Sequence, residues 1–355
     1  MTGIATLPPE WYTDDAVLRR ERAAIFAKNW TLFGPAHEVA APGAWRAETV
    51  NGWPLVVVRG ADGVLRGFHN VCRHRAAALF PPGAGSCNTI RCPYHGWTYD
   101  HAGHLLKTPN FGELPGFDPA KHGLFPVRVD LWRGLVFVAI DEAAPDLLSW
   151  LGSIPDLCRD FPTAPEMEYF DSFVVTGSAN WKAYCDNTVE GYHLPFVHRR
   201  LTQAVEPGDV NIYALDDGKL VVFDVGYRND GSSLRGARGI WFYRFPGFQT
   251  VIGERGFKAE RIEPSGPGGL KSTSWAWYRD LPQSDRADAF AWAQAIVRED
   301  LGICEAVQAN FAAGVYRTGF LSPKQETHVA RFQALVREAL EGEAERPAEL
   351  RAAAR

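Results

Sequence analysis

The chain has 355 residues, of which 46% are hydrophobic and 22% charged, and its formal net charge at pH 7 is −5. This length suits one large domain or two ordinary ones, and the composition is that of a globular protein. The charge gives no reason to expect a nucleic acid or an anionic membrane as partner. No apolar run could span a bilayer, and the N-terminus lacks a signal-peptide pattern, so the sequence predicts a cytoplasmic protein.

The first part of the chain predicts one helix and then a small β domain. Residues 14–29 place Leu18, Ala24, Ile25 and Phe26 near one face of a helix. The Gly and Pro clusters that follow separate short β-rich runs, which is typical of an all-β domain. These runs lie at 55–58, 65–68, 89–92 and 134–140.

The second part predicts a larger α+β domain. A short helix is expected around 145–160, and two long helices at 285–313 and 323–342. Strand-like runs lie between them at 168–177, 219–227, 239–251 and 270–280. We therefore divide the chain into a helical N-terminal segment (1–36) that packs on the second domain, a β domain (37–142) and a second domain (143–355).

Two Cys–His pairs occur within the predicted β domain. They are Cys72-x-His74 and Cys92-x-x-His95, with 17 residues between them. In a reducing compartment such pairs favour metal ligands over disulfides. A single zinc can use two Cys and two His, but zinc fingers do not pair one Cys with one His on each loop. A Rieske 2Fe–2S cluster needs two thiolates on one iron and two imidazoles on the other, which this pattern fits.

A second group of ligand types follows in the predicted α+β domain. His193 and His198 lie near Asp186 and Glu190. Two imidazoles and one carboxylate form the facial triad of non-haem Fe(II) oxygenases, but the pattern HLPFVH alone is a weak signal for it. The two groups of ligands are a stronger signal together than apart. A cluster that transfers single electrons either belongs to an electron carrier or supplies electrons to a catalytic centre in the same chain.

Several segments resemble the Rieske non-haem iron oxygenases over nearly the whole chain. They are FAKNWTLFG, CRHRA, CPYHGWTYD, EDLGICEAVQ and the segment NWKxxxDNxxExYHxxxxH that begins at Asn180. The resemblance implies an α+β protein with an N-terminal all-β Rieske domain that holds a 2Fe–2S cluster at Cys72, His74, Cys92 and His95. A helix-grip (START-like) catalytic domain with a mononuclear Fe(II) would follow it.

The resemblance also implies the ligands of the mononuclear iron, which are His193, His198 and Asp300. The helical wheel supports Asp300 independently, because an unpaired charge within an apolar stripe needs compensation. The stripe consists of Ala293, Ile296, Val297, Ile303, Cys304 and Val307, within about 60° of Asp300. Glu299 and Glu305 point away from it and are interpreted as surface charges.

In the same family an acidic residue three positions before the first iron histidine connects the two metal sites between subunits. Here Glu190 would link His95 of one chain to His193 of the next, and Asp186 and Asn187 would support the same helix. The implied assembly is a homotrimer. The chain has neither a G-x-G-x-x-G dinucleotide motif nor a ferredoxin-type cysteine run, so a separate NAD(P)H-dependent reductase, with or without a ferredoxin, must supply electrons.

The substrate stays open between two classes. The closest resemblance is to the branch that includes choline monooxygenase, which implies a quaternary ammonium compound, but aromatic-ring hydroxylases belong to the same branch. Aromatic residues in the second domain could form a cation–π cage, line a pocket for a flat ring, or pack the core. They are Trp241, Phe242, Tyr243, Phe245, Phe248, Trp275, Trp277 and Tyr278. The reaction would hydroxylate, dihydroxylate or demethylate the substrate. Two other readings are a Rieske electron-transfer protein with a non-catalytic second domain and a zinc-binding scaffold.

Overall fold

The computed structural model describes residues 4–227 and 238–344 and divides the chain into two units. The larger unit joins Met1–Ala27 to Pro145–Arg355, and the smaller unit is Lys28–Ala144. The sequence placed the first boundary at residue 36. The structure assigns residues 28–36 to the smaller unit, because strand β2 (Thr31–Pro35) pairs with β11 (Leu135–Ala139) there.

The smaller unit is built from two antiparallel sheets. Its seven-stranded sheet has the order β2-β11-β10-β5-β4-β3-β6, and a three-stranded sheet has the order β7-β8-β9. The remaining strands are β3 (Ala44–Val50), β4 (Trp53–Arg59), β5 (Leu65–His69), β6 (Gly83–Ser86), β7 (Ile90–Arg91), β8 (Thr98–Tyr99), β9 (Leu105–Lys107) and β10 (Pro126–Trp132). Short 3₁₀ turns lie at Ala36–Val39 and Pro119–Lys121.

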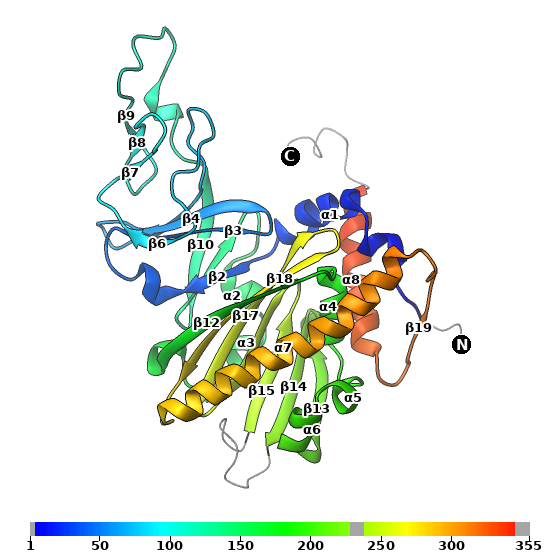
Figure 1. The fold of residues 1–355 in the computed structure, drawn as a ribbon. Coiled ribbons are helices and arrows are strands. Elements are labelled where there is room, and N and C mark those ends of the chain that lie inside the picture. The colour runs from blue at the N-terminus through cyan, green and yellow to red at the C-terminus, as the bar shows by residue number, and fades with distance from the viewer. Residues whose placement is uncertain (1–3, 228–237, 345–355) are drawn as a thin grey trace. The chain divides into compact units, whose positions relative to one another are not determined.

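The larger unit is a seven-stranded antiparallel sheet with helices packed on it. The strand order is β12-β18-β17-β16-β15-β14-β13, so the last six strands form a continuous meander that β12 joins. The strands are β12 (Glu168–Gly177), β13 (Val205–Leu215), β14 (Leu220–Tyr227), β15 (Arg238–Arg244), β16 (Phe248–Gly253), β17 (Gly256–Gly266) and β18 (Gly269–Tyr278). The long helix α7 (Gln283–Ala312) runs across one face of this sheet (Figure 1).

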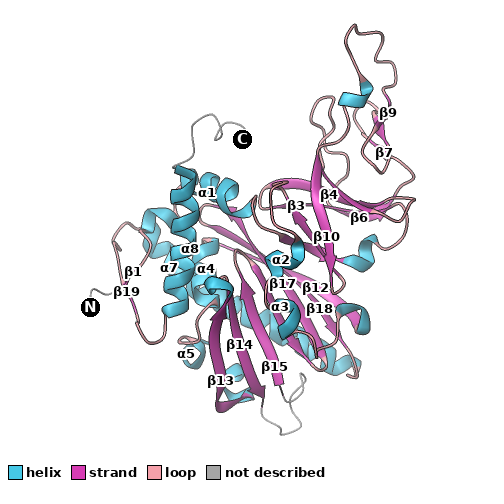
Figure 2. Ribbon diagram, turned by 180° about the vertical axis from the view of Figure 1, so that it is seen from behind, coloured by secondary structure: helices cyan, strands magenta, loops and turns pink. Residues whose placement is uncertain are grey.

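The other helices of the larger unit are short except for α8 (Figure 2). They are α1 (Asp15–Glu21), which continues as a π-helix (Arg22–Phe26), α2 (Leu147–Leu151), α3 (Ile154–Leu157), α4 (Trp181–Thr188), α5 (Leu194–Val197), α6 (Arg199–Ala204) and α8 (Thr327–Ala344). Strands β1 (Ile4–Ala5) and β19 (Phe320–Leu321) pair, and 3₁₀ turns lie at Pro9–Tyr12, Ala164–Glu166 and Asp216–Gly218. Among the described residues, no helix has the length and apolar composition needed to cross a membrane.

The sequence Asn180-Trp181-Lys182 fixes the start of helix α4. The Asn180 side chain accepts a hydrogen bond from the backbone N–H of Lys182, which is the usual N-cap arrangement. Trp181 donates its indole N–H to Glu21 at 2.8 Å, and the Lys182 ammonium donates to the same carboxylate at 2.6 Å. The side chains of Lys182 and Glu21 are fully buried, so the N-terminal helix α1 supplies the charge that α4 requires.

We expect Glu21→Gln to destabilise the larger unit by about 3–5 kcal/mol, because it leaves the Lys182 ammonium buried without its carboxylate partner. Urea unfolding of the variant and the wild type measures this loss. Asp15→Asn is the matched control on the same helix: its ion pair with Arg19 is 66–68% exposed and contributes at most about 1 kcal/mol. Equal effects of the two substitutions would contradict the anchoring role of Glu21.

Candidate functional site

Cys72 and Cys92 begin two turns of the same construction in the smaller unit. In each turn the cysteine N–H donates to the carbonyl five positions on, at 2.8 Å in both cases. The N–H four positions on donates back to the cysteine carbonyl, at 3.0 Å from Ala76 and 3.1 Å from Gly96. Ala76 and Gly96 therefore occupy equivalent positions, and both have positive φ, 58° and 74°. The two turns present matched pairs of side chains.

The side chains of these turns fit a Rieske cluster. Cys72 and Cys92 are each 2% exposed, and burial together with the Cys72 thiol raises the pKa of Cys92. The rings of His74 and His95 lie 4.7 Å apart, and Trp97 stacks on His74 at 4.8 Å. The Nδ1 atom of His74 is buried, and the described part of the chain offers it no hydrogen-bond partner. A buried nitrogen without a partner is destabilising, and a metal would supply the partner.

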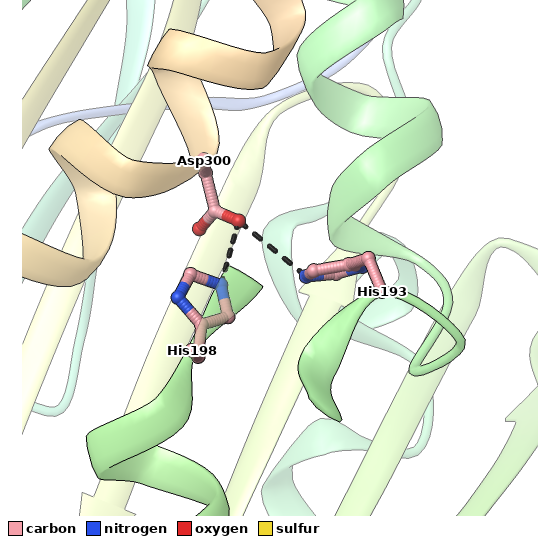
Figure 3. A group of neighbouring side chains, drawn as sticks. All are labelled: His193, His198 and Asp300. Carbon is pink, nitrogen blue, oxygen red and sulfur yellow. Dashed lines mark hydrogen bonds and ion pairs between the residues drawn. The ribbon is translucent and has the colours of Figure 1, made fainter. Parts of the chain in front are cut away.

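The second group lies in the larger unit and joins two distant segments (Figure 3). His193 and His198 flank α5, and Asp300 lies on α7. The Asp300 Oδ1 atom lies 2.8 Å from His198 Nε2 and 3.4 Å from His193 Nε2. One ligand atom from each of the three residues lies within 4.8 Å of the others, which is the spacing of a site for one metal ion. The structure thus brings together the three residues that the sequence predicted as iron ligands.

A carboxylate also forms a hydrogen bond with the Nδ1 atom of each imidazole. His193 Nδ1 lies 2.5 Å from Glu190 Oε1, and His198 Nδ1 lies 2.7 Å from Glu299 Oε2. These contacts fix both rings with Nε2 toward Asp300, as carboxylate–histidine–metal arrangements do. Glu299 lies at the surface as predicted, with 48% of its side chain exposed, but its carboxylate also contacts His198, which the sequence did not indicate. Nothing in the spacing along α7 signals this contact.

The three carboxylates make the pocket attractive to a cation. Burial alone would raise the pKa of Asp300, but hydrogen bonds from His193 and His198 outweigh it and lower the pKa to about 2. Burial likewise opposes a charge on His193, but Asp300 and Glu190 raise its pKa to about 9. The raised pKa values of His193 and His198 show that the carboxylates favour a positive charge on the rings, and a metal ion at the Nε2 atoms would take the place of the protons.

Helix α7 is less uniformly apolar around Asp300 than the wheel predicted. Ala293, Val297 and Cys304 are buried as expected, but Ile303 is 48% and Val307 39% exposed. The predicted stripe is therefore wrong at Ile303 and Val307, although Leu301, Cys304 and Gln308 in the same part of the helix are buried. Glu305 also makes a contact that the sequence did not indicate, since its carboxylate accepts the Ser178 N–H at 2.9 Å.

A cavity of about 80 Å³ lies between the two histidines and the sheet, and we call it the sheet-side cavity. Its floor includes a row of cross-strand partners, in which Phe223 pairs with Trp241, Trp241 with Val251, and Val251 with Lys258. The other lining residues are Asn187, Thr188, Glu190, His193, Leu194, His198, Leu201, Phe242, Tyr243, Gln249, Ala293, Ile296 and Asp300.

The structure separates the eight aromatic residues that the sequence left open. Trp241, Phe242 and Tyr243 line the sheet-side cavity. The other five are buried and do not line it, so they belong to the core: Phe245, Phe248, Trp275, Trp277 and Tyr278. Sequence reasoning missed Phe223, Gln249 and Lys258 as lining residues. Only the strand pairing places them on the cavity floor, because Phe223 pairs with Trp241, Gln249 with Tyr243, and Lys258 with Val251.

A larger hollow of about 650 Å³ lies on the other side of the same residues, and we call it the outer hollow. Asn187, Glu190 and His193 border both cavities. Asn187 donates to Asp300 Oδ1 at 2.7 Å, so it contacts the metal-binding group directly. Asp186 faces the outer hollow instead, and its Oδ2 accepts hydrogen bonds from Tyr12 at 2.8 Å and Gln333 at 3.1 Å.

Burial raises the pKa of Asp186 to about 7, although hydrogen bonds from Tyr12 and Gln333 and the charge of Lys182 partly oppose the shift. The folded state therefore holds this proton more tightly than the unfolded state. The stabilising contribution is complete below about pH 4 and is lost as pH rises through 7.

Asp186→Asn removes this titration, so its free energy of unfolding should gain on the wild type between about pH 4 and 7, by at most about 4 kcal/mol. Urea unfolding of both proteins over this range measures the difference. The exposed Asp171→Asn is the control. A constant difference between wild type and Asp186→Asn over the whole range would show that Asp186 does not titrate there.

Comparison with known proteins identifies both parts of the chain. Residues 29–118 match the model of the Rieske [2Fe-2S] domain. Residues 165–237 and 228–342 match that of the ring hydroxylating alpha subunit (catalytic domain). The chloroplastic choline monooxygenase of Atriplex hortensis is 27% identical over 88% of this chain and 73% of its own length. The carnitine monooxygenase oxygenase subunit of Acinetobacter pittii is 29% identical over 93% of this chain and 94% of its own length.

Solved structures agree with these matches. A quaternary ammonium Rieske monooxygenase superposes with a TM-score of 0.86 at 27% identity, over 95% of this chain and 96% of that one. A naphthalene 1,2-dioxygenase with indole bound shares the fold, with a TM-score of 0.77 at 19% identity over 94% of each chain. The predicted fold class and both predicted cofactors are thereby confirmed.

A Rieske domain and a ring-hydroxylating catalytic domain thus follow one another in this order, and their metal-binding groups fit the structure. The chain belongs to the Rieske non-haem iron oxygenases, as a terminal oxygenase α subunit with a 2Fe–2S cluster and a mononuclear non-haem iron that uses O₂.

Proposed function

We propose that His193, His198 and Asp300 hold the mononuclear iron of this oxygenase. The observation that carries the proposal is the convergence of two Nε2 atoms on one Asp300 oxygen, at 2.8 Å and 3.4 Å. When bound there, the iron supplies the reductive activation of dioxygen. Glu190 and Glu299 accept the Nδ1 protons and so keep the Nε2 lone pairs directed at the ion.

Cys72, His74, Cys92 and His95 are assigned to the cluster, with the thiolates on one iron and the imidazoles on the other. The buried Nδ1 atom of His74 without a hydrogen-bond partner supports this assignment. Electrons would reach the cluster from a separate NAD(P)H-dependent reductase, with or without a ferredoxin. None of the six cysteines forms a disulfide, which agrees with a reducing compartment, and we infer a cytoplasmic location.

We infer that the active assembly is a homotrimer in which Glu190 connects His95 of one chain to His193 of its neighbour. Glu190 is suited to this role because its carboxylate already contacts His193 and borders the outer hollow. Exposed apolar side chains surround it there, which is typical of a surface that another chain covers. They are Tyr192, Phe196, Ile303 and Val307, with exposed fractions of 52%, 77%, 48% and 39%.

The proposed reaction is the hydroxylation, and in suitable compounds the demethylation, of a small molecule in the sheet-side cavity. A methylated amine is the first candidate class, because relatives at 26–29% identity act on choline or carnitine and Trp241 offers an aromatic face to a cation. An aromatic compound is the second candidate class, since the same wall could stack on a flat ring.

A single-turnover experiment tests the function. The iron-loaded protein is reduced with dithionite and mixed with oxygen and one compound from a panel of methylated amines and aromatic acids. We expect a hydroxylated or demethylated product from at least one class. Asp300→Asn should lose the mononuclear iron and all product while it keeps the absorption spectrum of the cluster, because the variant lacks the anionic ligand.

Glu305→Gln is the control for the iron, because Glu305 lies on the same helix and bonds to Ser178 rather than to the histidines. Iron analysis of the two variants and the wild type gives the comparison. If Asp300→Asn retained all the iron of the wild type, Asp300 would not be a ligand. If the wild type held only the iron of its cluster, the chain would be an electron-transfer protein.

Mixing two inactive variants tests the path between chains. Glu190→Gln keeps the cluster but weakens the link, and we expect roughly a 10- to 100-fold loss of product formation. Cys72→Ser keeps Glu190 and the iron site but lacks the cluster. In mixed trimers the cluster of a Glu190→Gln chain would face the intact Glu190 of a Cys72→Ser chain, so activity should return. A mixture as inactive as its components, with mixed trimers verified by two affinity tags, would contradict transfer between chains.

A further inference from the structure

The floor of the sheet-side cavity has two unlike ends. Phe223 and Trp241 stack at 5.9 Å between centroids with 29° between their planes, and they form an aromatic end on β14 and β15. Lys258 lies on β17, two strands beyond Trp241 in the same cross-strand row. Strands lie about 4.8 Å apart, so the two backbones are separated by roughly 10 Å. A molecule with a few carbon atoms between its ends can contact both.

Lys258 is held in place but keeps hydrogen-bonding capacity. Its ammonium donates to Glu260 Oε2 at 2.6 Å, which is the one hydrogen bond found for it among the described residues. An ammonium has three N–H groups, so two remain for a ligand. The other oxygen of Glu260 accepts the Ser272 hydroxyl at 2.6 Å, and Glu260 is fully buried. The carboxylate is therefore satisfied by the protein, and Lys258 is the group that faces the cavity.

Gln249 supplies a second unsatisfied group beside it. Gln249 pairs with Glu260 across β16 and β17, so its side chain lies on the same face of the sheet as that of Lys258. It lines the cavity, and its Oε1 atom is buried with no hydrogen-bond partner in the described part of the chain. Buried polar atoms in native proteins almost always have a partner. The unsatisfied Gln249 atom is a carbonyl oxygen, so it needs a donor such as a ligand hydroxyl, whereas the remaining N–H groups of the Lys258 ammonium need an acceptor.

We propose that Lys258 and Gln249 form a polar subsite that binds an oxygen function of the substrate at the end remote from the bond that is oxidised. The Lys258 ammonium donates to a carboxylate or hydroxyl oxygen, and Gln249 Oε1 accepts the proton of a hydroxyl. This inference rests on the proposed function, because it places the substrate between the metal-binding histidines and the sheet. It narrows the substrate class to compounds with an oxygen-bearing tail. Plain aromatic hydrocarbons and alkyl ammonium ions without such a tail offer no hydrogen-bond partner to Gln249 Oε1 or to the remaining N–H groups of Lys258.

The pairing of Lys258 with Glu260 would allow the cavity to accept a substrate with a cationic head. The two charges largely cancel, so the subsite adds little repulsion toward a methylated ammonium group. That group would contact the aromatic end, where Trp241 is held by a 2.7 Å hydrogen bond from its indole N–H to the Tyr227 hydroxyl. A benzoate-type acid would place its ring at the same end. Both compound families share the oxygen function that Lys258 would bind.

Six probes in two matched families test the proposal on the iron-loaded holoenzyme. The first family is 4-(trimethylammonio)butanoate with its 4-hydroxybutyl and 4-methylpentyl analogues. The second family is benzoate, benzyl alcohol and isopropylbenzene. Calorimetry measures the dissociation constants. In at least one family we expect an oxygen-bearing probe to bind roughly 10- to 100-fold more tightly than the alkyl analogue, since its hydrogen bond is to a charged donor. The better oxygen function distinguishes a carboxylate from an alcohol substrate.

Two variants and a control assign this preference to the subsite. Lys258→Met with Glu260→Gln removes the ammonium without leaving a buried carboxylate unpaired, and it should reduce the preference to near unity. Gln249→Leu leaves the ion pair intact and should lower the preference for the hydroxyl-bearing probes, which covers the case in which the double variant does not fold. Lys271→Met is the control, because Lys271 is paired with Glu263 in the same sheet but does not line the cavity.

The proposal is overturned if the alkyl analogues bind as tightly as the oxygen-bearing probes in both families, if none of the six probes binds, or if the preference survives both Gln249→Leu and a folded double variant. Product analysis separates this from failure of the proposed function. If an acid binds through Lys258 but gives no product, the subsite is supported and the proposed function is contradicted. If the alkyl analogues are turned over as well as the oxygen-bearing probes, the proposed function is supported and the subsite is contradicted.

Discussion

The site in the larger unit depends on the hydrogen bond between a carboxylate and the Nδ1 atom of each imidazole. An imidazole has two nitrogens, and only a fixed hydrogen bond at one of them determines what the other presents. Glu190 and Glu299 provide these bonds to His193 and His198, at 2.5 Å and 2.7 Å, and both Nε2 atoms then meet Asp300. Three carboxylates around two rings bring more negative charge than a buried pocket tolerates. A cation between the two Nε2 atoms and Asp300 would balance this charge, which supports the proposed metal site.

Holding these charges in place requires support from far along the chain. Helix α4 leads to Glu190 and His193, and its first turn is fixed by the buried bonds of Trp181 and Lys182 to Glu21. Because Glu21 lies on α1, the N-terminal helix belongs to the same unit as the catalytic sheet. The ion pair contributes position more than stability, since burying two charges nearly offsets their attraction. A site that must hold imidazoles to a few tenths of an ångström gains from such rigid placement.

The structure brings together His193, His198 and Asp300, which the sequence predicted as metal ligands, whereas much of their surroundings could not be predicted, and the reason is physical. Candidate ligands that lie close together in the sequence, such as Cys72-x-His74, can be recognised from their spacing alone. Asp300 was indicated by the resemblance of EDLGICEAVQ to the family, and its place in a partly apolar helix face supported it, because a carboxylate there needs a partner. The contact of Glu299 with His198 could not be predicted, because helical position does not encode the direction that an exposed side chain takes. Lys258 and Gln249 enter the cavity only through the register of β15, β16 and β17, which forms between residues distant in sequence.

This division suggests how one fold serves different substrates. The imidazoles and Asp300 come from the α4–α5 segment and α7, whereas the cavity floor comes from neighbouring strands. Because side chains alternate between the faces of a strand, a substitution on the floor changes the ligand contacts without moving the helices that hold the metal. Trp241 and Lys258 sit two strands apart in one row. Their separation, rather than the chemistry at Asp300, then sets which molecule presents which bond to the iron.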